Sequence, residues 1–555
     1  MQTFIERTLG QQIAYMAEKY PDDVMIQYTD RDYRRTWKEF DAECEEIARG
    51  FMALGLKKGA HISIWATNVP AWLLTFFGSA KMGGILITVN TSYKLFELEY
   101  QLGQSDTECL VMIDGYKGTS YIDIVNQLCP ELADSEPGQL QCKKFPALRS
   151  VIFAGEQECP AGMIPWSRLY DLAKTVPYED FVALRDGQSC HDVVNFQYTS
   201  GTTGFPKGVM LTHYNILNNG MTIGDGMKFT HADKLCITVP FFPCFGMVLA
   251  IMACITHGTA MVPVDIFNPK KVMDAIVDEQ CTAVHGVPTM FIAMIEHPDF
   301  EKYDFSNMRT GIMAGSPCPV KTMLDVNEKM NMRDIVIVFG QTESSPGATM
   351  TTTSDDTERR CATVGKAFPQ VECKIVDIET GKTLPPGQIG EFCARGYNIM
   401  KGYYKMPEAT AQAIDEDGWL HSGDLAVCDE DGYYKVTGRL KDMVIRGGEN
   451  IYPKELEECL YHHPKVKDVQ VIGVPSKKYG EEVCACVIMK DGEEASEDEI
   501  KGYYKENVAF FKIPRYIWFM EDFPMTASGK IQKVVLRERA VEKFTLQTDN
   551  SIETA

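Results

Sequence analysis

Long hydrophobic runs are missing from this chain of 555 residues. The longest apolar stretch, Met247 to Ile255, is too short to cross a bilayer. The first segment, Met1 to Pro21, has no basic stretch followed by an apolar core, so it does not resemble a secretory signal. We therefore expect a cytoplasmic protein with no transmembrane segment, which leaves peripheral contact with a membrane open.

An excess of basic residues is also missing. The 77 acidic residues outnumber the 55 basic ones and give a net charge of −22. Because nucleic-acid binding needs a basic surface, we expect no nucleic-acid partner. Small phosphorylated molecules remain open as ligands, since a local glycine-rich loop with a lysine acts over a short range.

Cysteine pairs with the spacing of a metal site are absent as well. Eighteen cysteines in 555 residues are too sparse for a disulfide scaffold. Cys484 and Cys486 are separated by one residue, which suits a strand better than a zinc knuckle. The pair His462-His463 has no partner cluster nearby in the sequence. We expect reduced thiols and no metal role for these residues.

The length and the hydrophobic pattern indicate more than one domain. A chain of this size exceeds what one hydrophobic core usually supports. Helix and strand patterns alternate at first, as in Thr36 to Leu56 followed by His61 to Trp65, which favours an α/β fold with a mainly parallel sheet. Period-two segments such as Val371 to Val376 then indicate a small β-barrel-like subdomain. We predict a large N-terminal domain, 1–438, and a small α+β C-terminal domain, 439–555.

The most informative segment is Tyr198 to Gly208, which holds three glycines, four aliphatic hydroxyls and one lysine, Lys207. Glycines let backbone N–H groups approach a ligand, hydroxyls add donors, and a lysine supplies positive charge. We therefore predict a phosphate-binding loop, which we favour over a plain surface loop. Val193 to Gln197 reads as a strand and Met210 to Leu217 as a helix start, so the loop is expected to join strand to helix. Lys207 precedes Gly208, so the loop is not a Walker A motif.

Further segments combine glycine with a charged residue. They are Phe339 to Glu343, His421 to Asp424, Gly438-Arg439, Gly447 to Asn450 and Ser528 to Lys530. A carboxylate near a phosphate loop can hold Mg²⁺, an aspartate can accept from ribose hydroxyls, and a lysine can offset charge on a phosphoryl group. Together the segments indicate ATP chemistry.

With these motifs in one order, the chain resembles the adenylate-forming superfamily of acyl-CoA synthetases, nonribosomal adenylation domains and firefly luciferase, most closely the medium- and long-chain fatty acid–CoA ligases. The resemblance covers nearly the whole chain. It implies a ligase that uses ATP, Mg²⁺ and CoA: a carboxylate attacks the α-phosphate, pyrophosphate leaves, and a thiol then displaces AMP from the acyl-adenylate.

The resemblance also implies roles for individual residues. It assigns the β- and γ-phosphates to the Tyr198 to Gly208 loop, the α-phosphate to Thr342, and magnesium to Glu343 with Thr199. Residues expected to bind ATP or AMP are Thr199, Ser200, Gly201, Thr202, Thr203, Gly204, Lys207, Gly315, Ser316, Pro317, Phe339, Gly340, Gln341, Thr342, Asp424, Arg439 and Lys530. Residues expected to be catalytic are Lys530, Glu343, Thr342 and Arg439.

The second half-reaction has its own implied residues. In the family the C-terminal domain rotates about a hinge, here Lys441, and a glycine-rich segment, here Gly447, Gly448 and Glu449, borders the CoA tunnel. The implied acyl pocket includes Phe242, Phe245, Gly246 and His285. One departure is Pro243, which stands where the family usually has a histidine or aromatic gate, and a proline cannot swing or donate in the same way.

Four functions remain open at this point. The favoured one is a freestanding acid–CoA ligase acting on a fatty acid, because the acyl segments are mostly apolar and only a short tail, Ile531 to Ala555, follows Lys530. The alternatives are an aryl or arylalkanoic acid–CoA ligase, and an enzyme that loads a carrier-protein pantetheine or stops at the adenylate. A non-catalytic nucleotide or acyl sensor is less favoured, since the residues expected to bind phosphate, magnesium and ribose and the expected catalytic lysine are all present. We expect a monomer or homodimer.

Overall fold

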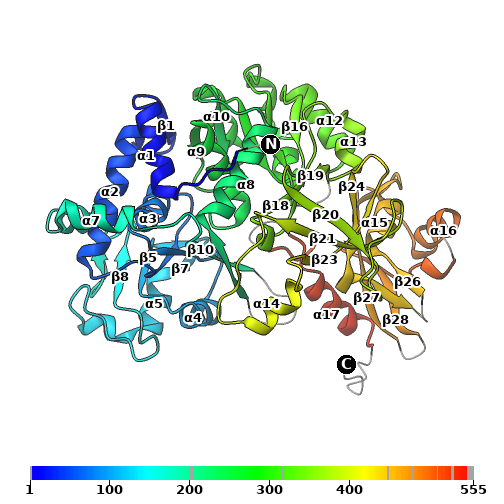
Figure 1. The fold of residues 1–555 in the computed structure, drawn as a ribbon. Helices are drawn as coiled ribbons and strands as arrows, with labels where there is room; N and C mark the ends of the chain where they lie inside the picture. Colours follow the sequence, from blue (N-terminus) through cyan, green and yellow to red (C-terminus); the bar gives the residue numbers. More distant parts are fainter. Residues whose placement is uncertain are drawn as a thin grey trace. The chain divides into compact units, whose positions relative to one another are not determined.

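The computed structural model describes residues 3–199, 206–315, 318–446, 449–476, 479–508, 510–526 and 530–546 (Figure 1). The chain forms two compact units. One consists of Met1–Cys373 with Ala394–Leu420, and the other of Lys374–Cys393 with His421–Ala555. The boundary predicted between residues 438 and 439 stays a prediction. Among the described helices, none is long and apolar enough to cross a membrane.

The first unit contains an eight-stranded sheet with the order β22-β11-β10-β4-β3-β5-β8-β9. From β10 to β9 every neighbouring pair is parallel, whereas β11 and β22 pair antiparallel. The bounds are β3 His61–Trp65, β4 Ile85–Thr88, β5 Cys109–Met112, β8 Ser150–Phe153, β9 Ile164–Pro165, β10 Val193–Thr199, β11 Lys207–Thr212 and β22 Gly402–Tyr403. The mainly parallel sheet expected from the alternating pattern is confirmed.

A second sheet of seven strands, β16-β15-β14-β12-β13-β1-β2, is parallel apart from β2. Its bounds are β1 Val24–Gln27, β2 Arg34–Thr36, β12 Lys234–Ile237, β13 Ala260–Pro263, β14 Ala283–Gly286, β15 Thr310–Met313 and β16 Asp334–Val336. A small sheet of β17 Val338–Gly340, β18 Gly347–Met350 and β19 Lys366–Ala367 follows, and a two-stranded ribbon joins β6 Gly115–Tyr116 to β7 Thr119–Ser120.

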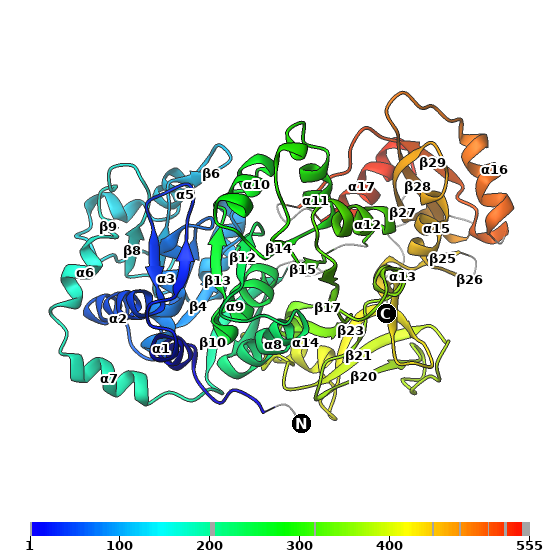
Figure 2. The ribbon, with the colours of Figure 1, turned by 90° about the horizontal axis from the view of Figure 1, so that it is seen from above.

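Helices connect and cover these strands, and local sequence signals fix several of their ends. Thr8 caps α1 (Leu9–Lys19) and Thr36 caps α2 (Trp37–Ala53), while Pro70 begins α3 (Pro70–Lys81). Helices α8 (His213–Gly226) and α9 (Ala253–His257) pack side by side (Figure 2). The other α-helices of this unit are α4 Leu95–Gln104, α5 Tyr121–Leu128, α6 Arg168–Ala173, α7 Tyr178–Asp186, α10 Pro269–Asp278, α11 Pro288–Ile295, α12 Val320–Lys329, α13 Thr357–Ala362 and α14 Pro407–Ala413.

The prediction that the phosphate-binding loop joins strand to helix is wrong. The loop joins β10 to β11, which pair antiparallel, and α8 begins only at His213. The residues from Lys207 to Thr212 include Val209 and Leu211, which are buried on the sheet. Thr212 then accepts a hydrogen bond from the backbone N–H of Asn215 and so starts the helix one strand later than expected.

The second unit contains two sheets. The β-rich subdomain expected after residue 365 is present as the four-stranded sheet β20-β21-β23-β24. The C-terminal sheet has the order β26-β25-β28-β27, with β29 also beside β28. The bounds are β20 Val371–Val376, β21 Gly390–Gly396, β23 Leu420–Cys428, β24 Tyr434–Arg439, β25 Val444–Arg446, β26 Glu449–Ile451, β27 Val466–Ser476, β28 Gly480–Met489 and β29 Tyr516–Phe519.

Helices α15 (Pro453–Tyr461), α16 (Glu497–Asn507) and α17 (Lys533–Lys543) complete this unit. Val444, Leu456, Val469 and Tyr504 belong to a hydrophobic cluster that is built entirely from residues after Arg439. A core of its own lets this part of the chain fold as a separate body, as a small α+β domain requires.

Candidate active site

Strand pairing sets the two ends of the phosphate-binding loop opposite each other. Thr199 ends β10 and Lys207 begins β11, and the two residues are partners in the antiparallel register. The loop therefore leaves and re-enters the sheet at one place, with a hydroxyl on one side and an ammonium on the other. Ser200, Gly201, Thr202, Thr203 and Gly204 lie outside the described residues.

Glu343 lies in a short 3₁₀ helix, Thr342–Ser344, that follows β17. Its side chain is half-buried, and its Oε1 accepts a 2.7 Å hydrogen bond from the hydroxyl of Tyr403. The backbone carbonyl of Glu343 also accepts from the N–H of Met400, 2.9 Å away. The turn is closed by Ser344, whose N–H donates to the carbonyl of Gln341 at 2.7 Å. Thr342 and Glu343 are thus held in a fixed turn.

Tyr403 links this turn to the phosphate-binding loop. It lies in β22, where it pairs with Val209 of β11, and its ring centroid is 4.9 Å from the Nζ of Lys207. Burial, and then the neighbouring Glu343 carboxylate, raises the pKa of the Tyr403 hydroxyl well above its ordinary value. The phenol therefore stays protonated and can donate to Glu343.

Sequence reasoning missed Tyr403. The residue sits 60 positions after Glu343, in a Lys-Gly-Tyr-Tyr stretch that carries no recognisable chemistry by itself. Only the pairing of a two-residue strand with β11 brings it to the site. The glycine of this stretch, Gly402, has a φ of 135°, which side-chain-bearing residues rarely adopt.

The expected adenine-binding residues lie at strand ends of the same unit. Phe339 and Gly340 are in β17, and a Cβ at Gly340 would lie 1.9 Å from the carbonyl oxygen of Pro346, so only glycine fits there. Gly315 follows β15 and has a φ of 88°. Gln341 precedes the Glu343 turn. Ser316 and Pro317 lie outside the described residues.

Asp424 and Arg439 form an ion pair in the second unit. They are register partners on β23 and β24, and Arg439 Nε lies 2.8 Å from Asp424 Oδ1. The Asp424 side chain is 5% exposed and that of Arg439 is 47% exposed, so the carboxylate is covered while the guanidinium reaches solvent. A buried carboxylate with a fixed cation beside it is suited to accept hydrogen bonds from a sugar.

Other predicted residues of the second unit are placed only in part. Lys530 is exposed, and its backbone N–H donates to Thr526 Oγ1 at 3.0 Å. Lys441 lies in a short 3₁₀ helix, Leu440–Asp442, directly after Arg439. Gly447 and Gly448 lie outside the described residues, and Glu449 begins β26.

Two of the expected acyl-pocket residues, Phe245 and Gly246, begin a π-helix, Phe245–Met252, and Phe242 lies just before it. π-helical turns are rare in proteins, and those that occur are often found at functional sites. Phe242 is buried, and Gly246 approaches the chain so closely that a Cβ would lie 2.0 Å from the carbonyl oxygen of Pro240. The segment is apolar, which fits an acid with an aliphatic or aromatic side group better than an acid whose side group is charged.

His285 anchors this π-helix from β14. The side chain is fully buried; its Nε2 donates to the carbonyl of Leu249 at 2.9 Å, and its Nδ1 accepts from the N–H of Ile312 at 3.2 Å. Burial lowers the pKa of His285 to about 4, so the ring is neutral near pH 7. Because both ring nitrogens contact the backbone, His285 links the π-helix to β14 and β15.

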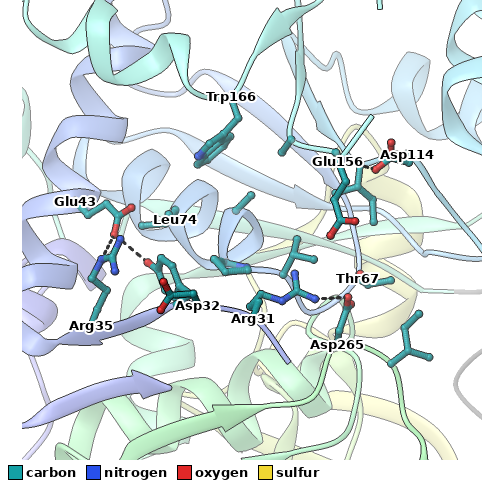
Figure 3. A pocket seen from close by; sticks show the side chains of 18 of the residues that line it. Arg31, Asp32, Arg35, Glu43, Thr67, Leu74, Asp114, Glu156, Trp166 and Asp265 are labelled. Atoms are coloured by element: carbon teal, nitrogen blue, oxygen red, sulfur yellow. Dashed lines mark hydrogen bonds and ion pairs between the residues drawn. The ribbon is translucent and has the colours of Figure 1, made fainter. Parts of the chain in front are cut away.

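A cavity of about 600 Å³ is also present in the first unit (Figure 3). It lies beyond the carboxyl ends of β3, β5 and β8, where Thr67, Asp114 and Glu156 line it. Arg31 points to Asp265, at 2.7 Å, and Arg35 to Glu43, at 2.8 Å. Its lining carboxylates, Asp32, Glu43, Asp114, Glu156 and Asp265, outnumber its two arginines. That balance disfavours phosphate binding, and the lining includes none of the predicted site residues.

Comparison with known proteins identifies the family. The profile described as "AMP-binding enzyme" matches residues 13–404, and "AMP-binding enzyme C-terminal domain" matches residues 455–530. The Bacillus subtilis (strain 168) protein named "Putative acyl-CoA synthetase YngI" is 52% identical over 548 residues, which is 99% of this chain and 100% of that protein. The mitochondrial medium-chain acyl-CoA ligase ACSF2 of Homo sapiens is 39% identical over 97% of this chain and 88% of its own length.

Solved structures agree with the sequence matches. The crystal structure of ATP-bound MatB from Rhodopseudomonas palustris has a TM-score of 0.84 at 29% identity, and the match covers 96% of this chain and 99% of that one. A Mycobacterium tuberculosis fatty acyl CoA synthetase has a TM-score of 0.75 at 26% identity, with 97% and 99% covered. The fold, the motifs and the full-length relatives agree, and the chain belongs to the AMP-binding enzyme family, in which it is an AMP-forming acyl-CoA synthetase.

Proposed function

We propose that the chain activates a medium-chain fatty acid with ATP and Mg²⁺ and transfers the acyl group to CoA. The contact between Tyr403 and Glu343 carries this proposal, because it presents a fixed carboxylate beside the phosphate-binding loop. The ACSF2 relatives, which are named medium-chain ligases, support the chain length.

The residues beside the loop fit a magnesium ion. One oxygen of Glu343 accepts from the phenol of Tyr403, which orients the carboxylate. Mg²⁺ prefers such oxygen ligands and usually binds through one or two carboxylates plus substrate phosphates. Glu343 with the hydroxyl of Thr199 would hold the ion, which supplies charge neutralisation at the phosphates of ATP.

Lys207 and the backbone of the loop would hold the β- and γ-phosphates, which leave as pyrophosphate. Thr342 would contact the α-phosphate from the neighbouring turn, and Phe339, Gly340, Gln341 and Gly315 would line the adenine. Gly315 and Gly340 both have a positive φ, and a Cβ at Gly340 would clash with the carbonyl oxygen of Pro346, so the backbone of this proposed site depends on glycine. Ser316 and Pro317 would extend this adenine site.

In the second unit, Asp424 would accept from the ribose hydroxyls while Arg439 compensates its charge. Lys530 would bridge the acyl carboxylate and the α-phosphate, where a cation reduces the repulsion between two anions as they approach. We propose that this domain then rotates about Lys441, withdraws Lys530, and presents Gly447, Gly448 and Glu449 to the CoA arm.

The acid would lie among Phe242, Phe245, Gly246 and the ring face of His285. The apolar side chains of Phe242, which is buried, and Phe245, which is half-buried, support an alkyl chain. Pro243, in place of a gate residue, favours one alternative, transfer to a protein-bound pantetheine. Efficient consumption of free CoA by the purified enzyme excludes that alternative.

A pyrophosphate-release assay over short-, medium- and long-chain and aromatic acids, with and without CoA, tests the proposal. We expect the highest kcat/KM with medium-chain fatty acids and acyl-CoA as the product. A preference for aromatic acids would support the arylalkanoic alternative, and the absence of turnover with every acid would support a nucleotide or acyl sensor.

We also propose a cytoplasmic location. All eighteen cysteines lie in the described ranges and are free thiols, which suits a reducing compartment. Peripheral contact with a membrane and the choice between monomer and homodimer stay predictions.

A further inference from the structure

Three metal-ligating side chains meet at one point of the second unit. Glu391 and Cys393 are two residues apart on β21 and therefore on one face of the strand, and His421 is on the neighbouring strand β23 (Figure 1). The His421 Nδ1 lies 2.8 Å from Glu391 Oε2 and 3.5 Å from Cys393 Sγ. The three ligand atoms all lie within 4.8 Å of one another. Of the three, only His421 lies in a segment that the sequence pattern marks, His421 to Asp424, and no motif marks Glu391 or Cys393.

The three atoms are spaced nearly as a tetrahedral zinc site needs. Zn–S distances of about 2.3 Å and Zn–N distances of about 2.0–2.1 Å place sulfur and nitrogen about 3.5 Å apart. The observed Sγ to Nδ1 distance is 3.5 Å. The same geometry places nitrogen and carboxylate oxygen about 3.4 Å apart, so Glu391 Oε2 has to retreat by about 0.6 Å. A rotation of the glutamate side chain supplies that movement.

The cluster is not arranged as a nucleophilic relay. In a cysteine–histidine–carboxylate relay, the thiol and the carboxylate contact different ring nitrogens, so that one orients the ring while the other exchanges a proton. Here both Cys393 and Glu391 face the same nitrogen, Nδ1. A metal ion requires several ligand atoms close to one point, as the Glu391 oxygen, the Cys393 sulfur and the His421 nitrogen are here.

Burial and charge also fit a metal ion. The Cys393 side chain is buried, while His421 is 31% exposed and Glu391 14% exposed, which leaves a route from solvent. A thiolate and a carboxylate together carry two negative charges, which a divalent cation neutralises. Glu391 Oε1 accepts from the N–H of Gly423 at 2.9 Å, so the carboxylate can turn its other oxygen to a metal without losing this bond.

We propose that Glu391, Cys393 and His421 bind a borderline-soft divalent metal such as Zn²⁺, with a fourth ligand from solvent. On binding, the thiol of Cys393 loses its proton to solvent, the sulfur and Nδ1 donate their lone pairs to the metal, and the imidazole proton moves to Nε2. Affinity therefore falls as the pH is lowered. The bound ion ties β21 to β23 three residues before Asp424. Sulfur favours Zn²⁺ or Co²⁺ over Mg²⁺, so this site is distinct in chemistry from the magnesium site at Glu343.

Co²⁺ titration of the full-length protein, freed of metals with a chelator, tests the site. We expect one Co²⁺ per chain and a thiolate-to-cobalt charge-transfer band, which stoichiometric Zn²⁺ removes and millimolar Mg²⁺ does not. Cys393→Ser should abolish the band, and His421→Asn should weaken Co²⁺ binding at least about 10-fold. Cys428→Ser is the matched control, because it changes a half-buried thiol at the other end of β23 from His421; it should leave the charge-transfer band and the Co²⁺ affinity unchanged.

X-ray absorption of the zinc-loaded wild-type protein checks the ligands without any substitution. One sulfur with nitrogen and oxygen neighbours at the zinc supports the proposal. A cobalt complex without the charge-transfer band, a band that survives Cys393→Ser, or a zinc with no sulfur neighbour overturns it.

Discussion

The hydroxyl of Tyr403 donates a 2.7 Å hydrogen bond to the carboxylate of Glu343 and so joins β22 to the turn after β17. The same ring lies 4.9 Å from the ammonium of Lys207. One tyrosine therefore contacts both the proposed magnesium ligand and the lysine of the phosphate-binding loop. Its position makes it a positioning residue for the first half-reaction.

Replacing Tyr403 with phenylalanine should impair adenylation selectively. A hydrogen bond to a charged group is worth about 1.5–3 kcal/mol, so we expect kcat/KM for MgATP to fall about 10- to 100-fold. The Mg²⁺ concentration for half-maximal rate should rise, because Glu343 loses the donor that orients it. Thioester formation from supplied acyl-adenylate should be unchanged.

The matched control is Tyr404→Phe. That neighbouring tyrosine donates to Asp106 at 2.8 Å, away from Glu343. Equal losses in the two variants, or an unchanged Mg²⁺ dependence in Tyr403→Phe, would contradict the role given to Tyr403.

Lys530→Ala should separate the two half-reactions. Losing a cation that offsets two approaching anions should lower the rate of acid-dependent pyrophosphate release by about 10²–10³-fold. Acyl-CoA formation from supplied acyl-adenylate should stay close to the wild-type rate. Lys501→Ala, which removes one member of a surface ion pair with Glu497, serves as the control. If both steps fall equally in Lys530→Ala, the rotation of the C-terminal domain is not supported.

Gly340→Ala should damage the adenine site. The new Cβ would lie 1.9 Å from the carbonyl oxygen of Pro346, so the backbone must shift. We expect a KM for ATP raised at least about 10-fold and a destabilisation of about 1–3 kcal/mol. In Gly502→Ala no neighbour lies within 4 Å of the new Cβ, and the helix α16 should gain about 0.5–1 kcal/mol. An ATP KM unchanged in Gly340→Ala would place the adenine elsewhere.

His285 should make stability depend on pH. Burial lowers the pKa of its ring to about 4, whereas the unfolded chain takes up this proton at about pH 6.5. The neutral ring therefore contributes fully to the free energy of unfolding above about pH 6.5. This contribution is lost as the pH falls toward 4, and the loss is about 2 kcal/mol at about pH 5.

Thermal unfolding measured between neutral and mildly acidic pH checks this. The midpoint of His285→Leu should fall less with acidity than that of the wild type, although it is lower at neutral pH. His231→Gln changes a half-exposed ring and should follow the wild-type slope. Parallel slopes for His285→Leu and the wild type would show that the buried ring is not the source.

The sequence predicts those features whose chemistry is compressed into short segments. The phosphate-binding loop can be predicted from the sequence because its glycines, hydroxyls and Lys207 fall within eleven residues. The helix Trp37–Ala53 and the strand His61–Trp65 can be read because their periodicity is strong and the Thr36 cap is local. Asp424 and Arg439 are each marked by a motif, whereas their ion pair is known only from the pairing of β23 with β24.

What could not be predicted depends on strand pairing over long sequence separations. Tyr403 reaches Glu343 only through the two-residue strand β22, and Cys393 reaches His421 across neighbouring strands 28 residues apart. The sequence predicts a helix start directly after the loop, where the structure has a strand, because Met210 to Leu217 spans the end of β11 and the beginning of α8. The cavity beside Arg31 is lined from many separate segments, so no local motif marks it.

Oxygen transfer tests the proposed reaction most directly. In a reaction with a medium-chain fatty acid whose carboxylate carries ¹⁸O, a carboxylate oxygen attacks the α-phosphorus, and CoA later breaks the bond between that oxygen and the acyl carbon. We predict one ¹⁸O atom in AMP, none in pyrophosphate, and equal amounts of AMP and acyl-CoA. Label found in inorganic phosphate alongside ADP, or unlabelled AMP, would contradict an acyl-adenylate route.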